Sequence, residues 1–255
     1  MPSEPAPPGT RQRTTLLALL TLSVVFLALL LGPVRSTAAL YRVGPADAAY
    51  VWLRNTLKGP VRIGVQVGHD AASEQPEELA GLRQNTGGHF ASLDELTVNR
   101  AVAADLQAIL EPRGIAVELL PATIPVRYSA DLVVSLHADS VDDTARNGYK
   151  SAHFEPARNA LEPLLKEIID RVYLEGSGLR DDSINTSGAM YYYYAFNNVP
   201  YRHTVNPRTP ALIVELGYIS NAADRRFLTD SDEPARLLAE GIVQFLEETR
   251  RVPPR

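Results

Sequence analysis

The most constraining feature of the sequence is the segment 210–221, PALIVELGYISN. Its apolar and β-branched residues, 211–214, lie between a proline and Gly217, which is typical of a buried strand. The strand is expected to end at Glu215. Because a carboxylate is costly to bury without a cation or a donor, Glu215 requires partners from elsewhere in the chain. Either a structural salt bridge or a catalytic site would meet that requirement.

Other apolar segments alternate with helical patterns on both sides of this strand. Strands are expected over residues 61–67, 115–120 and 132–136, with an edge strand over 148–154. Helices are expected over residues 94–111, 158–174, 222–228 and 233–248. This alternation predicts an α/β fold, with a mixed, mostly parallel sheet covered by helices on both faces. A single domain over residues 58–250 accounts for all of these elements.

The N-terminal part of the chain predicts a membrane segment. Residues 14–31, TTLLALLTLSVVFLALLL, carry no charge and follow Arg11 and Arg13. A helix of this length extends about 27 Å, about enough to span the hydrocarbon core of a bilayer. The basic flank places the N-terminus in the cytoplasm and the rest of the chain outside.

We therefore expect a Pro-rich cytoplasmic tail over 1–13, a single-pass anchor over 14–32, and a tether ending in a short helix over 33–57. The alternative is a cleaved signal peptide, because the small residues 36–38 (Ser-Thr-Ala) resemble a cleavage site. The domain would then be secreted. Both interpretations place it on the far side of the cytoplasmic membrane.

The net charge and the absence of cysteine exclude several kinds of partner and site. The formal net charge is −5, and no basic block is present, which argues against nucleic acid as a partner. The chain has no cysteine, which excludes disulfides, thiolate metal sites and cysteine nucleophiles. Histidine, aspartate and glutamate remain as metal ligands.

Three of the expected strands end in ionisable residues, namely His69, His137 and Glu215. The carboxyl ends of strands are where α/β folds usually place their chemistry. Glu95 is expected in the first turn of a helix, where the helix dipole favours a carboxylate even without a function. Glu78, in the long loop after His69, is a second candidate carboxylate ligand.

Two imidazoles and one carboxylate are the donor set of a catalytic zinc site, since they leave a fourth tetrahedral position for water. Such a site lowers the pKa of water and polarises a carbonyl oxygen. A further carboxylate, Glu215, would take the proton of the water and deliver it to a leaving amine. The residues therefore predict metal-assisted hydrolysis.

Four segments resemble, in order, the motifs of the zinc-dependent N-acetylmuramoyl-L-alanine amidases (amidase type 3), a family of bacterial cell-wall hydrolases. They are residues 67–69 (VGH), Glu95 with Asn99, residues 135–139 (SLHAD) and residues 214–221 (VELGYISN). The resemblance covers about residues 60–248.

The resemblance implies His69, Glu95 and His137 as zinc ligands and Glu215 as the general base. It implies peptidoglycan as the substrate, cleaved at the amide between N-acetylmuramic acid and the L-alanine of the stem peptide. It also implies the mixed, mostly parallel sheet described above.

Two departures from the family pattern affect the surroundings of the site. Asp70 follows His69 where the family commonly has glycine, so Asp70 is expected either to orient a ligand or to alter the approach of substrate. Residues 119–121 (LLP) replace a threonine–arginine pair. Neither change removes a ligand.

The remaining candidates concern substrate. Tyr193 and Asn197 are expected to line a groove for glycan or peptide, and His203 to contact substrate or stabilise an oxyanion. His89 is expected to be solvated and His153 to pack in the edge strand.

Two other functions remain open at this point. The chain could be an inactive amidase fold that binds peptidoglycan or regulates other proteins, or a zinc hydrolase of another amide, such as a carboxypeptidase. A protein activator is a further candidate partner.

Overall fold

The computed structural model describes residues 45–252. The expected cytoplasmic tail, the membrane segment and most of the tether, which together make up residues 1–44, lie outside the described residues. The described part begins with helix α2 (Pro45–Lys58), in agreement with the short helix expected before the domain. Within residues 45–252, no helix has the length and apolar character needed to cross a membrane.

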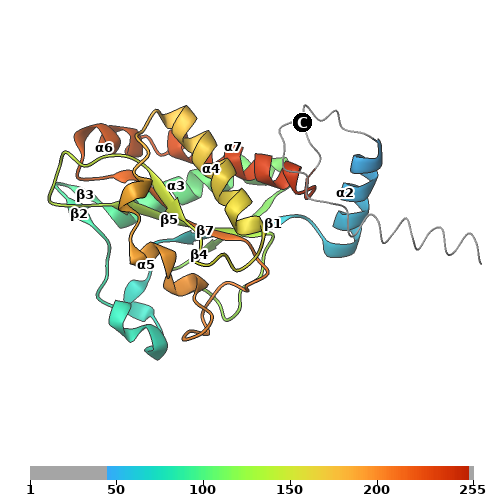
Figure 1. Ribbon diagram of the computed structural model, residues 1–255, viewed down its shortest axis with the longest axis horizontal. Helices are drawn as coiled ribbons and strands as arrows, with labels where there is room; N and C mark the ends of the chain where they lie inside the picture. The colour runs from blue at the N-terminus through green and yellow to red at the C-terminus, as the bar shows by residue number, and fades with distance from the viewer. Residues whose placement is uncertain (1–44, 253–255) are drawn as a thin grey trace, which may run out of the picture.

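The centre of the molecule is a five-stranded sheet with the order β4-β1-β5-β7-β6 (Figure 1). Its strands are β1 (Arg62–Val67), β4 (Ala116–Leu120), β5 (Leu132–Asp139), β6 (Lys150–Ala152) and β7 (Ala211–Tyr218). The first four in sheet order are parallel, and the edge strand β6 runs antiparallel to β7. The predicted mixed, mostly parallel sheet is confirmed.

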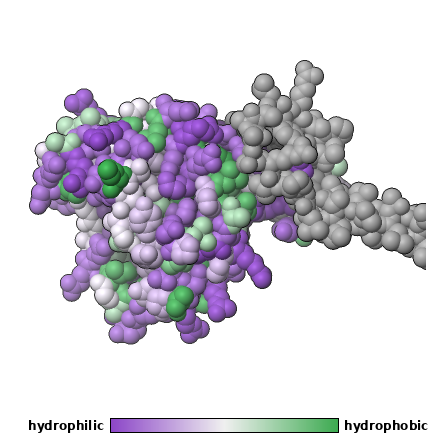
Figure 2. All heavy atoms as spheres, in the orientation of Figure 1, coloured by the Kyte–Doolittle hydropathy of each residue, from purple (hydrophilic) through white to green (hydrophobic). Residues whose placement is uncertain are grey.

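Three long helices pack on one face of the sheet, as Figure 1 shows: α3 (Glu95–Leu110), α4 (Leu161–Ser177) and α7 (Asp232–Glu248). Their apolar stripes and one set of alternating strand residues form the larger core, which includes Val65, Val134 and Val214. The short helix α6 (Ala222–Leu228) follows β7 and spans the predicted residues. Hydrophilic side chains cover most of the surface seen in Figure 2, so the apolar residues of these helices are turned inward.

The opposite face of the sheet is covered by long connections with short helices. These include α5 (Gly188–Tyr191) and the 3-10 turn η5 (Tyr194–Phe196), and they bury Phe196 against Val133 and Ile213. The connection from β1 to α3 contains the 3-10 turns η1 (Ala72–Glu74) and η2 (Glu77–Leu82). It also contains a small hairpin, β2 (His89–Phe90) and β3 (Leu93–Asp94). Both long connections meet at the carboxyl edge of the sheet, where they surround the candidate site.

Strand β7 does not end at Glu215, as the sequence predicted, but continues to Tyr218. Strand β5 carries the ladder past the carboxylate, because Asp139 pairs with Tyr218 after a register shift, and Lys150 of β6 lies opposite Glu215. The Lys150 ammonium donates to Asp139 at 2.5 Å and to the Tyr218 hydroxyl at 2.6 Å. The cationic neighbour that sequence reasoning required for Glu215 is supplied by this antiparallel strand.

Asp131, the residue before β5, ties together the two ends of the described chain. Its carboxylate pairs with Arg54 of α2 and lies 3.4 Å from Arg251 Nε, beyond α7. It also accepts the backbone N–H of Arg62 at 3.0 Å. These contacts lie at the amino end of β5, opposite the end that carries His137.

Candidate metal centre

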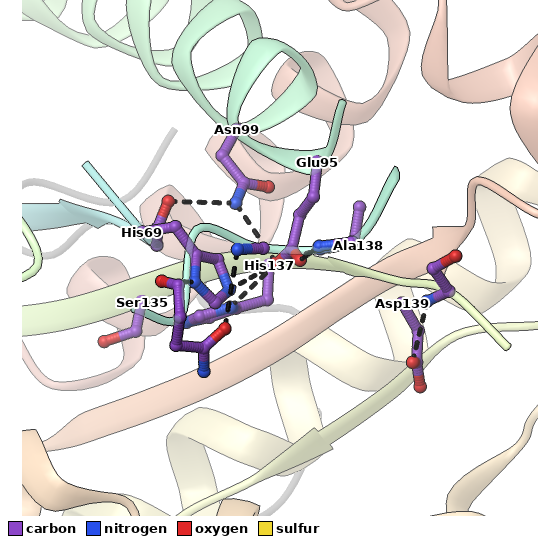
Figure 3. A network of polar contacts seen from close by, with 12 residues as sticks. His69, Glu95, Asn99, Ser135, His137, Ala138 and Asp139 are labelled. Atoms are coloured by element: carbon purple, nitrogen blue, oxygen red, sulfur yellow. Dashed lines mark hydrogen bonds and ion pairs between the residues drawn. The ribbon is translucent and has the colours of Figure 1, made fainter. Parts of the chain in front are cut away.

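Three side chains expected as ligands converge at the carboxyl edge of the sheet. His69 follows β1, His137 lies in β5, and Glu95 begins α3. One donor atom of each lies within 4.8 Å of the others, and this is the one such group found among residues 45–252. Figure 3 shows Glu95 extending from its helix toward both imidazole rings.

Glu95 is the centre of this cluster. Its Oε1 is 2.9 Å from His137 Nδ1 and 3.1 Å from His69 Nε2. The backbone N–H groups of Gly88 and Ala138 donate to its two oxygens at 2.8 and 3.3 Å. Burial alone would raise the pKa of Glu95, but the hydrogen bonds and charges of His137 and His69 outweigh it and hold that pKa well below its usual range. Glu95 is therefore kept as a buried carboxylate, the form that binds a cation.

The loop between β1 and α3 supplies the outer contact of His69. The Asn85 carbonyl accepts a hydrogen bond from His69 Nδ1 at 2.9 Å. Because a carbonyl can only accept, Nδ1 carries a proton, and Nε2, which faces Glu95, is the ring nitrogen left for a metal ion. The loop passes directly over the ring, since a Cβ on Gly87 would lie 3.0 Å from His69 Cδ2. Asn85 was not predicted as a contact of His69, although the run Asn-Thr-Gly-Gly signals a close backbone turn.

Gly68 allows His137 to approach the end of β1. A Cβ on Gly68 would lie 2.5 Å from His137 Cε1 and 2.5 Å from the Leu136 carbonyl oxygen. The next residue, His69, has φ of 65°, in the left-handed region. That conformation costs a non-glycine residue about 1–2 kcal/mol. Such local strain is characteristic of functional sites.

Glu215 lies beside His137, because the register of β5 and β7 pairs these two residues. Its Oε2 atom is buried and has no hydrogen-bond partner among the described residues. Burial raises the pKa of Glu215 well above its usual value, the charges of Glu95 and Asp139 raise it further, and Lys150 opposes them. A carboxylate oxygen without a protein partner is free to hold a reacting water.

A cavity of about 270 Å³ opens beside the cluster and is lined by His69, His137 and both long connections. Tyr193 and Asn197, both expected to contact substrate, lie on its wall. The Tyr193 hydroxyl is also 3.0 Å from His137 Nε2, a contact that the sequence did not predict. His203 is not part of the lining.

Glu78, the competing carboxylate, lies outside the cluster and binds His203 instead. Its Oε1 accepts the backbone N–H groups of His203 and Arg202 at 2.9 and 3.0 Å, and lies 2.8 Å from His203 Nδ1. These hydrogen bonds, chiefly that of the His203 backbone, lower the pKa of Glu78. The pairing connects the loop after β1 to the segment before β7.

Three other polar residues are also placed away from the metal cluster. Asp70 binds Arg100 of α3, with Nε at 3.1 Å from Oδ1, rather than a histidine ligand. His89 is exposed, as expected, and its Nδ1 is 2.6 Å from Asp94 Oδ1. His153 follows β6 and bonds to the carbonyl of the next residue.

The donor set fits a zinc ion. Two imidazoles and one carboxylate supply three tetrahedral positions, and the adjoining cavity gives access to a fourth. The outer nitrogen of His69 is held by a carbonyl, which is how proteins orient a metal-binding imidazole. Two nitrogen ligands disfavour magnesium and calcium, which prefer oxygen alone.

Comparison with known proteins gives the family. A family model described as N-acetylmuramoyl-L-alanine amidase matches residues 63–248, which include all of the site residues above. The chain belongs to this family. It is accordingly an amidase, a hydrolase that acts on peptidoglycan. No curated protein matches the chain significantly.

Solved amidase structures share the fold of this amidase. The catalytic domain of CwlV from Bacillus (Paenibacillus) polymyxa var. colistinus is 21% identical and has a TM-score of 0.52, covering 73% of this chain and 98% of that one. Ami1 from Mycobacterium smegmatis is 16% identical, with a TM-score of 0.56 and coverage of 73% and 96%. CwlD from Clostridioides difficile, solved in complex with the GerS lipoprotein, is 16% identical, with a TM-score of 0.55 and coverage of 73% and 98%.

Proposed function

We propose that this amidase cleaves the bond between the lactyl group of N-acetylmuramic acid and L-alanine with a zinc ion held by His69, Glu95 and His137. Glu215 is the proposed general base. The observation that carries the proposal is the convergence of three donor atoms within 4.8 Å, next to a strand whose Glu215 has an oxygen without a partner among residues 45–252. A bound zinc ion supplies Lewis acidity at this point and lowers the pKa of water.

The protein contributes proton transfer and positioning. Glu215 takes the proton of the attacking water and returns it to the leaving nitrogen of L-alanine. Lys150, opposite Glu215 on β6, favours the charged form of that base. Glu95 stays ionised because both histidines and two backbone N–H groups face it.

The cavity is the proposed binding site for the stem peptide. Tyr193 and Asn197 lie on its wall and would contact substrate directly. His203 is bound to Glu78 and is two residues from Tyr201 of the same wall, so its proposed role is to hold that wall in place.

The deciding experiment is cleavage of isolated peptidoglycan by the full chain, kept in a mild detergent, with and without a chelator. Products are identified by mass. The expected result is release of intact stem peptides beginning with L-alanine, lost on chelation and restored by zinc. New reducing ends or free D-alanine would overturn the choice of bond.

Absence of release needs a second measurement, the zinc content. A chain with one zinc per molecule and no activity would contradict an autonomous enzyme and favour either a missing protein activator or a peptidoglycan-binding function. Adding a cell-envelope extract separates these outcomes, because an activator restores release and a binding protein stays inactive.

We also propose that residues 14–32 anchor the chain in the cytoplasmic membrane, with residues 58–250 outside. The uncharged run after Arg11 and Arg13 supports this arrangement, as does the location of peptidoglycan. The full chain is expected to stay with membranes under alkaline extraction and to keep its N-terminus. A mature protein that begins near residues 36–38 would show signal cleavage instead.

A further inference from the structure

A hydrogen-bond network of buried polar side chains lies behind His137, on the side away from Glu95. His137 Nε2 is 3.0 Å from the Tyr193 hydroxyl, which is 3.2 Å from Gln66 Oε1. The Ser135 hydroxyl donates to the same Gln66 oxygen at 2.5 Å. Gln66, Ser135, His137 and Tyr193 are all buried, and Gln66 and Ser135 are fully so. Polar groups at such depth are retained in native cores when their hydrogen bonds are complete.

One backbone carbonyl determines which atom donates in each hydrogen bond of this network. Gln66 lies 2.7 Å from the carbonyl oxygen of Ala122, which can only accept, so the side-chain amide nitrogen of Gln66 must face it. Gln66 Oε1 therefore faces the other way, toward Tyr193 and Ser135. Since this oxygen can only accept, both hydroxyls must donate to it.

The Tyr193 hydroxyl in turn determines which nitrogen of the imidazole carries a proton. Once the Tyr193 hydroxyl has given its proton to Gln66, the lone pairs of its oxygen are directed at His137. A favourable contact at 3.0 Å then requires a proton on His137 Nε2. The other ring nitrogen, Nδ1, is 2.9 Å from the ionised Glu95 Oε1 and donates to it in the metal-free chain, so Nδ1 is the nitrogen that exchanges its proton for a metal ion.

We propose that Gln66 and Tyr193 are positioning residues that keep a proton on His137 Nε2 and thereby present the Nδ1 lone pair to the metal. The proposal rests on the proposed function for the metal site but assigns these two residues no contact with the reacting bond. It gives His137 the outer partner that Asn85 gives His69. The two imidazoles thus bind through different nitrogens, Nε2 of His69 and Nδ1 of His137.

The signal for this arrangement is visible in β1. Gln66 is the one polar residue of the strand sequence RIGVQV apart from Arg62 at its start, since the other four residues of the strand are apolar or glycine. A fully buried glutamine there has no packing advantage over valine or leucine. Gln66 links the Ala122 carbonyl to the Tyr193 hydroxyl by hydrogen bonds, which explains a polar residue at this position.

The test compares Tyr193→Phe with wild type in two measurements on the full chain in detergent. The first is the zinc dissociation constant, obtained by competition with a chromogenic chelator. The second is the Nε2–H signal of His137 in chains labelled with ¹⁵N-histidine, with and without zinc. Tyr193→Phe removes one oxygen and keeps the buried ring, so the fold should persist. Tyr191→Phe changes a tyrosine two residues earlier that does not line the cavity, and is the matched control.

Loss of the Tyr193 hydroxyl is expected to weaken zinc binding about 10–100-fold, the usual effect of losing an outer partner of a ligand. The Nε2–H signal should be protected from exchange in wild type and in Tyr191→Phe, and should exchange rapidly in Tyr193→Phe. Gln66→Leu should weaken zinc binding as well, but add little in the Tyr193→Phe background, because both changes break one path.

An unchanged zinc affinity with a protected Nε2–H in Tyr193→Phe would overturn the inference, and so would fully additive effects of the two substitutions. These readouts do not depend on turnover. A wild-type chain that binds zinc and shows the protected Nε2–H, yet releases no stem peptide, would contradict the proposed function and leave this inference standing.

Discussion

Glu95 and Glu215 lie at the same edge of the sheet, but their surroundings are opposite. Glu95 faces two histidines and accepts two backbone N–H groups, so its pKa is held well below the usual range. Glu215 has a buried oxygen without a partner among the described residues, and burial raises its pKa. Two carboxylates whose pKa values are driven apart are suited to different roles. The first is built to bind a cation and the second to exchange a proton.

The largest effect is expected from removing a partner of Glu95. His137→Ala deletes a donor atom 2.9 Å from Glu95 Oε1, and should abolish both zinc binding and amide cleavage. Zinc content after dialysis measures this loss. His203→Ala, which changes the histidine paired with Glu78, is the matched control and should keep its zinc. Wild-type zinc content in His137→Ala would remove His137 from the site.

Glu215→Gln sharpens the comparison because it should separate metal binding from catalysis. The amide keeps the shape of the side chain but cannot take a proton, so turnover should fall about 10²–10⁴-fold, the usual contribution of a general base. Zinc affinity should stay near the wild-type value, as measured by chelator competition. A variant that turns over normally would contradict the assignment of Glu215 as the base.

Gly68→Ala tests whether the approach of His137 to β1 sets the geometry around Glu95. The added Cβ would lie 2.5 Å from both the His137 ring and the Leu136 carbonyl, and a backbone atom cannot move aside easily. We expect a loss of about 1–3 kcal/mol in the free energy of unfolding, together with weaker zinc binding. Thermal unfolding and zinc titration measure the two. Gly81→Ala, where a Cβ meets no atom within 4 Å, is the control.

Glu78→Gln should have the smallest effect, because Glu78 is partly exposed and glutamine still accepts hydrogen bonds. A change below about 1 kcal/mol in the free energy of unfolding is expected, with zinc retained. The pKa of Glu78 is lowered from 4.5, so its contribution is present above pH 4.5 and is lost as the pH falls below that value. Urea unfolding across that range should give a slightly flatter profile for Glu78→Gln. Loss of zinc in this variant would reopen the choice between Glu78 and Glu95.

The elements could be predicted because strands and helices here have clear apolar periods, and the site edge followed from His69 and His137 at strand ends. The choice between Glu95 and Glu78 depended on family resemblance, since the path of the loop after β1 is not encoded in local propensity. The path of this loop also places Asp70 beside Arg100 and Asn85 beside His69.

The end of β7 was missed for a similar reason. A lone carboxylate predicts the end of a buried strand, but the pairing of Asp139 with Tyr218 carries β7 past Glu215. Lys150, which lies opposite that carboxylate, comes from an edge strand more than 60 residues earlier in the chain. Tyr193 lies on the wall of the cavity, and its contact with His137 could not be inferred from a run of four tyrosines. Contacts between distant segments, rather than segment identity, account for these differences.

The position of Asp131 has a consequence for how far this amidase can work from its attachment point. Arg54 and Arg251 both bind Asp131 at the amino end of β5, while His137 lies about 20 Å further along that strand. The chain therefore leaves the domain on the side opposite the catalytic cleft. If residues 14–32 are an anchor, the membrane attachment joins the domain at the end away from the cleft, so the attachment leaves the mouth of the cleft open to incoming glycan strands.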